Sequence, residues 1–256
     1  MKILLTRHGQ DDPLYRGGWS QRGLIDEGVK QSKLLGQCLT EKWLPIDKII
    51  SSDLSRAKET TSNILSSLNR PVKYYSTWRE MNNGDLAGLL NETAENKYPN
   101  LFFRTLYYND KYPNGESPHD FFERVIKAFK KLLTGKHENI LVVTHGGVIS
   151  IIIYYIKTIK WSNKLPIVPC KPTGLYEIHY DGNNCKIITE NYYDHLGHDY
   201  SAKKQLTKAV ACNAYIKLRT VTHYCCTIDI RYPVLRNGGQ KVPHPCGNFK
   251  RGALEN

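Results

Sequence analysis

Over the first 200 residues of the chain, short apolar runs alternate with longer segments in which apolar residues recur every three or four positions. The short runs predict buried strands, and the longer spacing predicts amphipathic helices. The predicted strands span residues 2–6, 47–51, 72–75, 139–144, 175–180 and 186–191. The predicted helices span residues 27–43, 53–68, 121–133 and 147–157.

Turn and cap signals add to this pattern. The turn residues Asp181-Gly182-Asn183-Asn184 predict a hairpin between the last two strands. Ser51, Ser52 and Asp53 are expected to cap the helix that follows them. Because strands alternate with helices, we expect right-handed crossovers and a mostly parallel central sheet. The predicted fold class is α/β, with three layers and helices on both faces of the sheet.

Residues 201–256 lose this pattern. Their apolar residues follow no sustained period, and proline and glycine interrupt the second half. They hold ten Lys or Arg residues and two acidic residues, and so carry +8 of the formal net charge of +12. We predict one domain over residues 1–200 and a basic, cysteine-containing extension of unknown structure over residues 201–256. The loss of acids and periodicity also fits a terminus that is not under selection for folding.

The excess of 36 Lys and Arg over 24 Asp and Glu favours an anionic partner. Nucleic acid, an anionic membrane and a phosphorylated substrate are the alternatives. The basic extension could hold nucleic acid through phosphate contacts. It matches no nucleic-acid-binding module, however, and a solvated extension is the expectation.

Other protein classes are excluded by composition. Three apolar residues separate Lys2 from Thr6, too few for a signal peptide. The longest apolar stretch, from Val148 to Ile156, is about half of the roughly 20 residues that a membrane-spanning helix needs. Seven cysteines, an odd number without ligand spacing, indicate neither a disulfide framework nor a metal site. We therefore expect a cytoplasmic protein with reduced thiols and no membrane partner.

Two segments of the chain resemble each other. Residues 3–9 and 141–147 both run from an apolar strand through threonine to a basic residue and glycine, and they place His8 and His145 after the two strands. In a parallel sheet the carboxyl ends of strands meet at one edge, where ligands bind. We expect the two histidines to face one pocket.

The residues around His8 suit phosphoryl transfer without a metal. A neutral imidazole is a competent nucleophile near pH 7, because the ordinary histidine pKa is about 6.5. Arg7 beside it offers a planar fork for phosphate oxygens. Arg56 falls in the first turn of a predicted helix, where the backbone also favours an anion.

Five sequence blocks in this order resemble the histidine phosphatase superfamily, which has a phosphoglycerate mutase-like fold. They are Arg7-His8-Gly9, residues 51–60 around Arg56, Arg79-Glu80, residues 113–117 and Thr144-His145-Gly146-Gly147. Gly18, Trp19, Leu24 and Gly28 also match the spacing of this family. The resemblance covers about residues 1–200 and identifies the chain as a member of branch 1.

The resemblance implies a role for each matching residue. His8 is the nucleophile that becomes phosphorylated, and Arg7 and Arg56 bind the phosphoryl group. His145 stabilises the phosphoryl charge, and Glu80 donates the proton to the leaving group. The expected activity is that of a phosphoric monoester hydrolase acting on a small phosphorylated substrate. Neither a metal nor another cofactor is expected.

Some of these residues have a second possible role, and the role of Glu80 has a second candidate residue. Gly9 and Gly146 are expected to allow a close backbone approach to the phosphate, although strand-to-loop geometry would also explain them. Gln10 could contact the phosphate or lie in a solvated loop. Asp85 competes with Glu80 as the proton donor. Glu116 is expected to cap or orient the helix that follows it rather than take part in the chemistry.

The same core residues serve phosphoglycerate mutases. The segment between Gly9 and Gly18 is about three residues shorter here than the mutase pattern and lacks its asparagine. This favours a phosphatase, with phosphoryl transfer of the mutase type as the alternative. The short insert 91–117 is rich in aromatic residues, which either pack against the sheet or line a lid over an apolar or planar substrate group.

Overall fold

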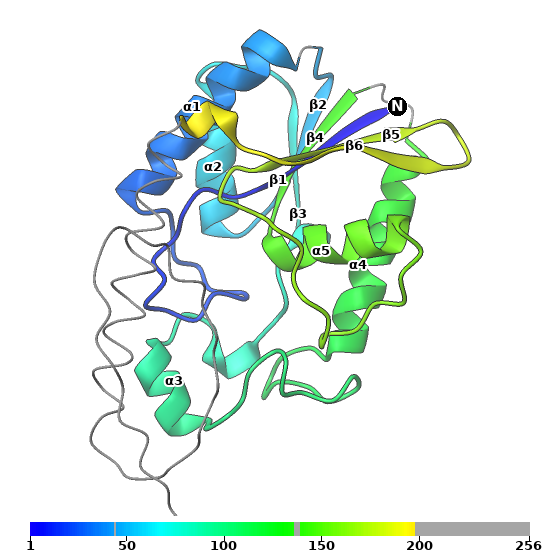
Figure 1. The fold of residues 1–256 in the computed structure, drawn as a ribbon. Helices are drawn as coiled ribbons and strands as arrows, with labels where there is room; N and C mark the ends of the chain where they lie inside the picture. The colour runs from blue at the N-terminus through cyan, green and yellow to red at the C-terminus, as the bar shows by residue number, and fades with distance from the viewer. Residues whose placement is uncertain (44, 136–138, 198–256) are drawn as a thin grey trace, which may run out of the picture. The chain divides into compact units, whose positions relative to one another are not determined.

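The computed structural model describes residues 1–43, 45–135 and 139–197. A six-stranded sheet forms its centre, in the order β3-β2-β4-β1-β5-β6 (Figure 1). The strands are β1 (Lys2–Arg7), β2 (Lys48–Ser52), β3 (Val72–Tyr75), β4 (Asn139–Thr144), β5 (Leu175–Tyr180) and β6 (Cys185–Tyr192). β1 to β4 pair in parallel, and β5 is antiparallel to both of its neighbours. The mostly parallel sheet and the final hairpin are therefore confirmed.

Five α-helices accompany the sheet in the described part of the chain. They are α1 (Asp26–Lys42), α2 (Ser55–Leu65), α3 (Asn91–Lys97), α4 (Pro118–Leu133) and α5 (Gly146–Ile156). Three short 3-10 segments span Ser76–Trp78, Gly84–Leu86 and Asp194–Leu196. The four longer helices agree with the predicted ones to within a few residues. α3, which has seven residues and buries only Ala94, is not among the predicted helices.

Two apolar cores lie on opposite faces of the sheet. Side chains alternate between the faces of a strand, so Leu4 of β1 packs with α1 and α2, whereas Ile3 and Leu5 pack with α4 and α5. β4 divides its side chains between the cores in the same way. Burial on both faces is what the unbroken apolar runs of β1 and β4 require. The predicted three-layer arrangement is confirmed.

The predicted cap of α2 is wrong. The N-cap position is Leu54, without a side-chain cap. The Asp53 carboxylate instead accepts two hydrogen bonds from Arg79, at 2.6 and 2.7 Å. The Ser52 hydroxyl lies 2.8 Å from a ring nitrogen of His145. The polar residues before α2 therefore face the edge of the sheet where β2 and β4 end.

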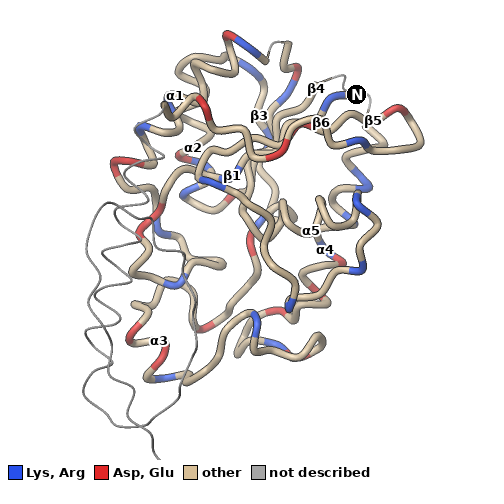
Figure 2. The backbone as a smooth tube through the Cα atoms, viewed as in Figure 1, with Lys and Arg blue, Asp and Glu red and all other residues tan. Residues whose placement is uncertain are grey.

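No helix of the described residues is long and apolar enough to cross a membrane. Basic and acidic residues are interspersed along the described backbone (Figure 2). The extension 201–256, with its +8 charge, lies outside the described residues, so its predicted character stays a prediction. Cys38, Cys170 and Cys185 are free thiols.

Candidate active site

His8 and His145 meet where β1 and β4 end. Arg7 of β1 pairs in register with Thr144 of β4, and the His8 backbone N–H donates to the Thr144 carbonyl at 2.9 Å. The two imidazole centroids are 5.0 Å apart, and the ring planes are inclined at 59°. Both rings are buried. Sheet pairing thus brings together two histidines that are separated by more than half of the chain.

The hydrogen bonds of His8 define its tautomer. Nδ1 lies 2.7 Å from the Gly9 carbonyl oxygen, which can only accept, so Nδ1 carries the hydrogen. Nε2 therefore carries a lone pair, which accepts a hydrogen bond from Arg56 Nε at 3.1 Å. Burial, followed by the charges of Arg56 and Arg7, holds the pKa of His8 well below its usual range. Both the hydrogen bond at Nδ1 and the lowered pKa favour a neutral ring without a hydrogen on Nε2.

Arg56 occupies the first turn of α2 and is almost completely buried. It donates to the carbonyls of Gly18 at 2.8 Å and Ser20 at 3.1 Å. Its Nε also lies 3.5 Å from the Asp11 carboxylate. Burial lowers the pKa of Arg56, and the charges of Asp11 and Glu80 partly offset this. The Arg56 guanidinium is thus held by several partners beside His8 Nε2.

Arg7 and His145 also lie beside His8. Arg7 is oriented by a hydrogen bond to the Cys170 carbonyl at 3.1 Å. His145 Nε2 lies 2.8 Å from the Ser52 hydroxyl, while its buried Nδ1 has no hydrogen-bond partner among the described residues. Burial, aided by the charge of Arg56, also holds the pKa of His145 well below its usual range. The lowered pKa favours a neutral ring, in which Nδ1 is the nitrogen that no described residue engages.

Glu80 lies against the N-terminus of α5. One carboxylate oxygen accepts from the Gly147 N–H at 2.9 Å, and the other from the Met81 N–H at 3.0 Å. Asp85 is engaged elsewhere, with the Tyr98 hydroxyl at 3.2 Å and the Asn114 amide at 2.9 Å. Of the two acids weighed as proton donors, Glu80 is the one that lines the pocket.

A pocket of about 360 Å³ brings together Arg7, His8, Arg56, Glu80 and Gly146. His145 packs against His8 beside it. A Cβ added to Gly146 would come within 4 Å of only one described atom, Arg7 Cδ, at 3.9 Å. Packing against the described residues therefore does not require glycine at this position.

Gly9 and Gln10 are not among the residues that line this pocket, and both lie against α1. A Cβ on Gly9 would stand 2.4 Å from the Gly28 carbonyl oxygen, so glycine is needed there for packing. The Gln10 backbone N–H donates to the Gln31 side chain at 3.0 Å. Their predicted contacts with substrate stay predictions.

Four residues that sequence reasoning missed contribute to the site. Asp11 faces Arg56, and Ser52 contacts His145. Trp19 and Arg124 both donate to the Glu80 carbonyl. Ser52 and Trp19 belong to matched blocks, which was an available signal. Asp11 and Arg124 had no distinguishing pattern.

Glu116 was expected to cap or orient α4, and it does not cap that helix. Ser117 is the N-cap and forms a reciprocal capping box with Asp120. Glu116 pairs instead with Arg124 on α4 at 2.6 Å. Among the described residues, no three His, Cys, Asp or Glu side chains are grouped so that they could hold a metal ion.

A sequence model of the histidine phosphatase superfamily (branch 1) matches residues 3–192. A 2,3-bisphosphoglycerate-dependent phosphoglycerate mutase of Buchnera aphidicola is 31% identical over 75% of this chain and 98% of the mutase. A broad-specificity phosphatase of Saccharomyces cerevisiae is 28% identical over 61% of this chain and 70% of the phosphatase. The solved structure of Bacillus stearothermophilus YhfR superimposes with a TM-score of 0.65 at 24% identity, covering 76% of this chain and 98% of YhfR.

With the fold and the paired histidines in place, the match over residues 3–192 establishes that the chain belongs to branch 1 of the histidine phosphatase superfamily. The similarity to YhfR extends this to the fold. The named relatives include both mutases and phosphatases, so family membership defines phosphoryl-transfer chemistry without choosing between the two activities.

Proposed function

We propose that the protein is a metal-independent phosphatase that hydrolyses small phosphomonoesters through phosphorylated His8. The observation that carries this proposal is the unprotonated Nε2 of the buried His8, in a pocket that is also lined by two arginines and two carboxylates. This set provides a nucleophile, cations for phosphoryl oxygens, and an acid.

In the first step, His8 Nε2 attacks phosphorus in line with the ester oxygen. The N–P bond forms, the P–O bond to the alcohol breaks, and the departing oxygen takes a proton from Glu80. In the second step, Glu80 removes a proton from water, whose oxygen attacks phosphorus as the N–P bond breaks. Phosphate and alcohol are the products, and Glu80 regains its proton.

The remaining groups stabilise the charge of the transferring phosphoryl group. The Arg7 fork and Arg56 suit its oxygens, since guanidinium–phosphate hydrogen bonds are charge-assisted. The unpartnered Nδ1 of His145 can donate a further hydrogen bond when it carries the proton. Both arginines are already oriented by backbone carbonyls, so little reorganisation is needed.

The charges of the pocket support phosphoester hydrolysis rather than the phosphoryl transfer of a mutase. Its lining residues include two cations, Arg7 and Arg56, and two acids, Asp11 and Glu80. A mutase must hold an intermediate with two phosphates and a carboxylate, which requires more cations than these. The segment between Gly9 and Gly18, which is shorter than the mutase pattern, also favours a phosphatase. Mutase-type transfer remains the alternative, as does nucleic-acid association through residues 201–256, and the cytoplasmic location stays a prediction.

Trapping the intermediate tests the proposal. Brief incubation with a ³²P-labelled phosphomonoester, followed by denaturation, is expected to leave a label on His8 that alkali preserves and acid removes. EDTA should change neither the labelling nor the turnover. Activity lost with EDTA, or turnover without an acid-labile label, would contradict the mechanism. Adding 3-phosphoglycerate to the labelled enzyme separates the two activities, because a mutase transfers the labelled phosphoryl group to the phosphoglycerate, whereas a phosphatase releases it as inorganic phosphate.

The leaving-group side of the pocket supports a substrate class. A second hollow of about 190 Å³ shares Gly18, Glu80, Gly147 and Ile167 with the phosphoryl pocket. Its other walls are mostly apolar and aromatic: Met81, Asn83, Phe103, Tyr112 and Phe121. An apolar cavity of about 150 Å³ is enough to hold a benzene molecule. We therefore propose esters of alcohols with a compact apolar group as preferred substrates.

Phe103→Ala is expected to lower kcat/KM for benzyl phosphate about tenfold, because about 1.4 kcal/mol of apolar contact is lost. For glycerol 3-phosphate, a polar ester of another alkyl alcohol, kcat/KM should change less than about twofold. Steady-state rates with the two esters measure this ratio. Phe102→Ala is the matched control, since Phe102 is exposed and stacks on Arg16. Equal losses for both esters would contradict the assignment of the hollow.

A further inference from the structure

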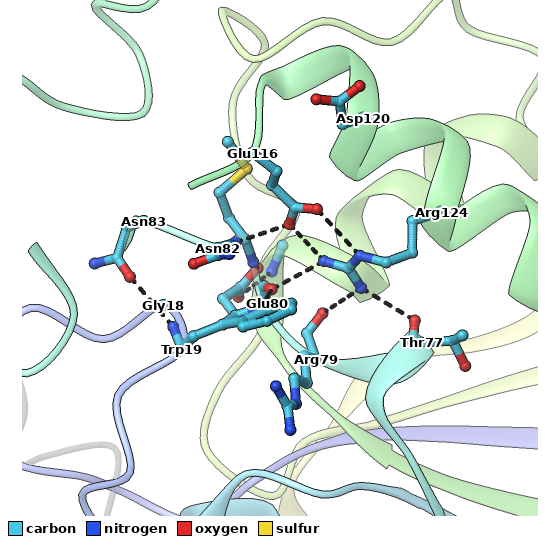
Figure 3. Close-up of polar contacts among 12 residues, drawn as sticks. Gly18, Trp19, Thr77, Arg79, Glu80, Asn82, Asn83, Glu116, Asp120 and Arg124 are labelled. Carbon is cyan, nitrogen blue, oxygen red and sulfur yellow. Dashed lines mark hydrogen bonds and ion pairs between the residues drawn. The ribbon is translucent and has the colours of Figure 1, made fainter. Parts of the chain in front are cut away.

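Arg124 of α4 binds the backbone that carries Glu80. Its guanidinium donates to the carbonyls of Thr77 at 3.1 Å, Arg79 at 3.0 Å and Glu80 at 3.0 Å (Figure 3). The three bonds join one side chain to a single turn of chain between β3 and the pocket. Such charge-assisted bonds from a planar, rigid fork restrict that segment more than neutral contacts would.

Glu116 extends this restraint to the other side of Glu80. Its carboxylate accepts from Arg124 Nη2 at 2.6 Å and from Nε at 3.2 Å. The same carboxylate accepts from the Asn82 N–H at 2.8 Å (Figure 3). The ion pair is mostly buried, with side-chain exposures of 18% and 13%. The backbone is thus held both before and after the residue that carries the acid.

Trp19 joins this segment to the phosphoryl pocket. Its indole N–H donates to the Glu80 carbonyl at 2.7 Å. The residue before it, Gly18, offers its carbonyl to Arg56 at 2.8 Å. Shifting the Glu80 segment therefore also disturbs the loop that orients Arg56.

The Glu80 carboxylate depends on this backbone. Both hydrogen bonds recorded for it in the described chain come from backbone N–H groups, those of Met81 and Gly147. Its position relative to His8 therefore follows the path of residues 77–82. A displacement of about 1 Å in a catalytic group can cost a hundredfold in rate.

We propose that Arg124 and Glu116 are positioning residues that set the Glu80 carboxylate for proton transfer to the leaving oxygen. The proposal rests on the proposed function in one respect, the role of Glu80 as proton donor. It assigns the ion pair a part in leaving-group protonation beyond joining α4 to the segment before the pocket.

Leaving-group dependence separates this role from a structural one. Benzyl phosphate releases a poor leaving group that needs a proton, whereas p-nitrophenyl phosphate releases a stable phenolate that does not. Arg124→Lys and Glu116→Gln are each expected to lower kcat/KM for benzyl phosphate about 30-fold, because general acids contribute roughly 10²- to 10⁴-fold. The loss for p-nitrophenyl phosphate should stay below about fivefold, since proton transfer contributes little there.

Two further variants complete the experiment. Glu80→Gln is the reference and should show the same selective loss, to a larger degree. Glu177→Gln is the matched control: it neutralises another mostly buried carboxylate, one that pairs with Lys2 and His179 away from the pocket, and should not be selective. Thermal unfolding of each variant measures the structural contribution separately.

The outcomes distinguish the two levels of the proposal. Selective losses in Glu80→Gln, Arg124→Lys and Glu116→Gln support it. If Glu80→Gln loses activity selectively toward benzyl phosphate but the Arg124 and Glu116 variants do not, the positioning role is overturned and the proposed function stands. An unselective Glu80→Gln overturns both the proton-donor assignment and the positioning role.

Discussion

Alanine in place of His8 is expected to lower kcat/KM for any phosphomonoester by about 10⁴-fold or more, because it removes the atom that bonds to phosphorus. The arginines and His145 would remain able to bind phosphate, so phosphate should still protect the variant against thermal unfolding. Steady-state rates and the acid-labile ³²P label measure the loss, and both are expected to vanish together.

The control for this variant is His179→Ala. His179 lies on β5 with its side chain half exposed, and it pairs with Glu177 away from the pocket. Its replacement should leave turnover and labelling unchanged. A His8→Ala protein that keeps turnover would show that another group, or water directly, attacks phosphorus.

Acid is expected to destabilise the fold through the two buried histidines. Unfolded histidine takes up a proton near pH 6.5, whereas the pKa values of His8 and His145 in the native protein are held well below this. Between these values the unfolded chain binds protons that the native chain does not, so the free energy of unfolding falls as the pH falls. Each histidine contributes about 1.4 kcal/mol per pH unit, and the pair about 2.7.

Urea denaturation between about pH 6.5 and 5 measures this slope, which starts where free histidine titrates. Carboxylates also contribute, so the informative quantity is the difference between wild type and His145→Gln. The free energy of unfolding of the variant should depend less steeply on pH, by about 1.4 kcal/mol per pH unit, which corresponds to one proton. This difference is expected even if the variant is less stable at every pH. An unchanged slope would mean that His145 is protonated in the native protein or that the unfolded chain shields it.

The main elements of the fold could be predicted because their signals are local. β1 and β4 are unbroken apolar runs, and α4 has a pronounced apolar stripe, so sequence spacing alone identifies them. α3 could not be predicted because a helix of seven residues with one buried side chain has almost no recurring apolar pattern in its sequence. The cap of α2 was misjudged because Ser52 and Asp53 suit a cap chemically, and only tertiary partners reveal that His145 and Arg79 engage them instead.

The candidate site divides in the same way. Residues after strand ends or in matched blocks, such as His8, His145 and Arg56, can be assigned from the sequence alone. Asp11 and Arg124 cannot be assigned in this way. Asp11 contacts Arg56, which lies 45 residues further along the chain, and Arg124 contacts the Glu80 carbonyl, 44 residues before it. No spacing rule connects residues that only the folded chain brings together.

The place of β1 in the sheet has a consequence for how the protein is made. β1 lies between β4 and β5, which follow it by more than 130 residues. At roughly 5 to 20 residues per second, a ribosome needs on the order of ten seconds or more to supply β4. Until then the apolar residues Ile3, Leu4 and Leu5 have neither neighbour, and His8 cannot meet His145. Each nascent chain therefore passes through an inactive, aggregation-prone interval that ends only when nearly the whole domain has been synthesised.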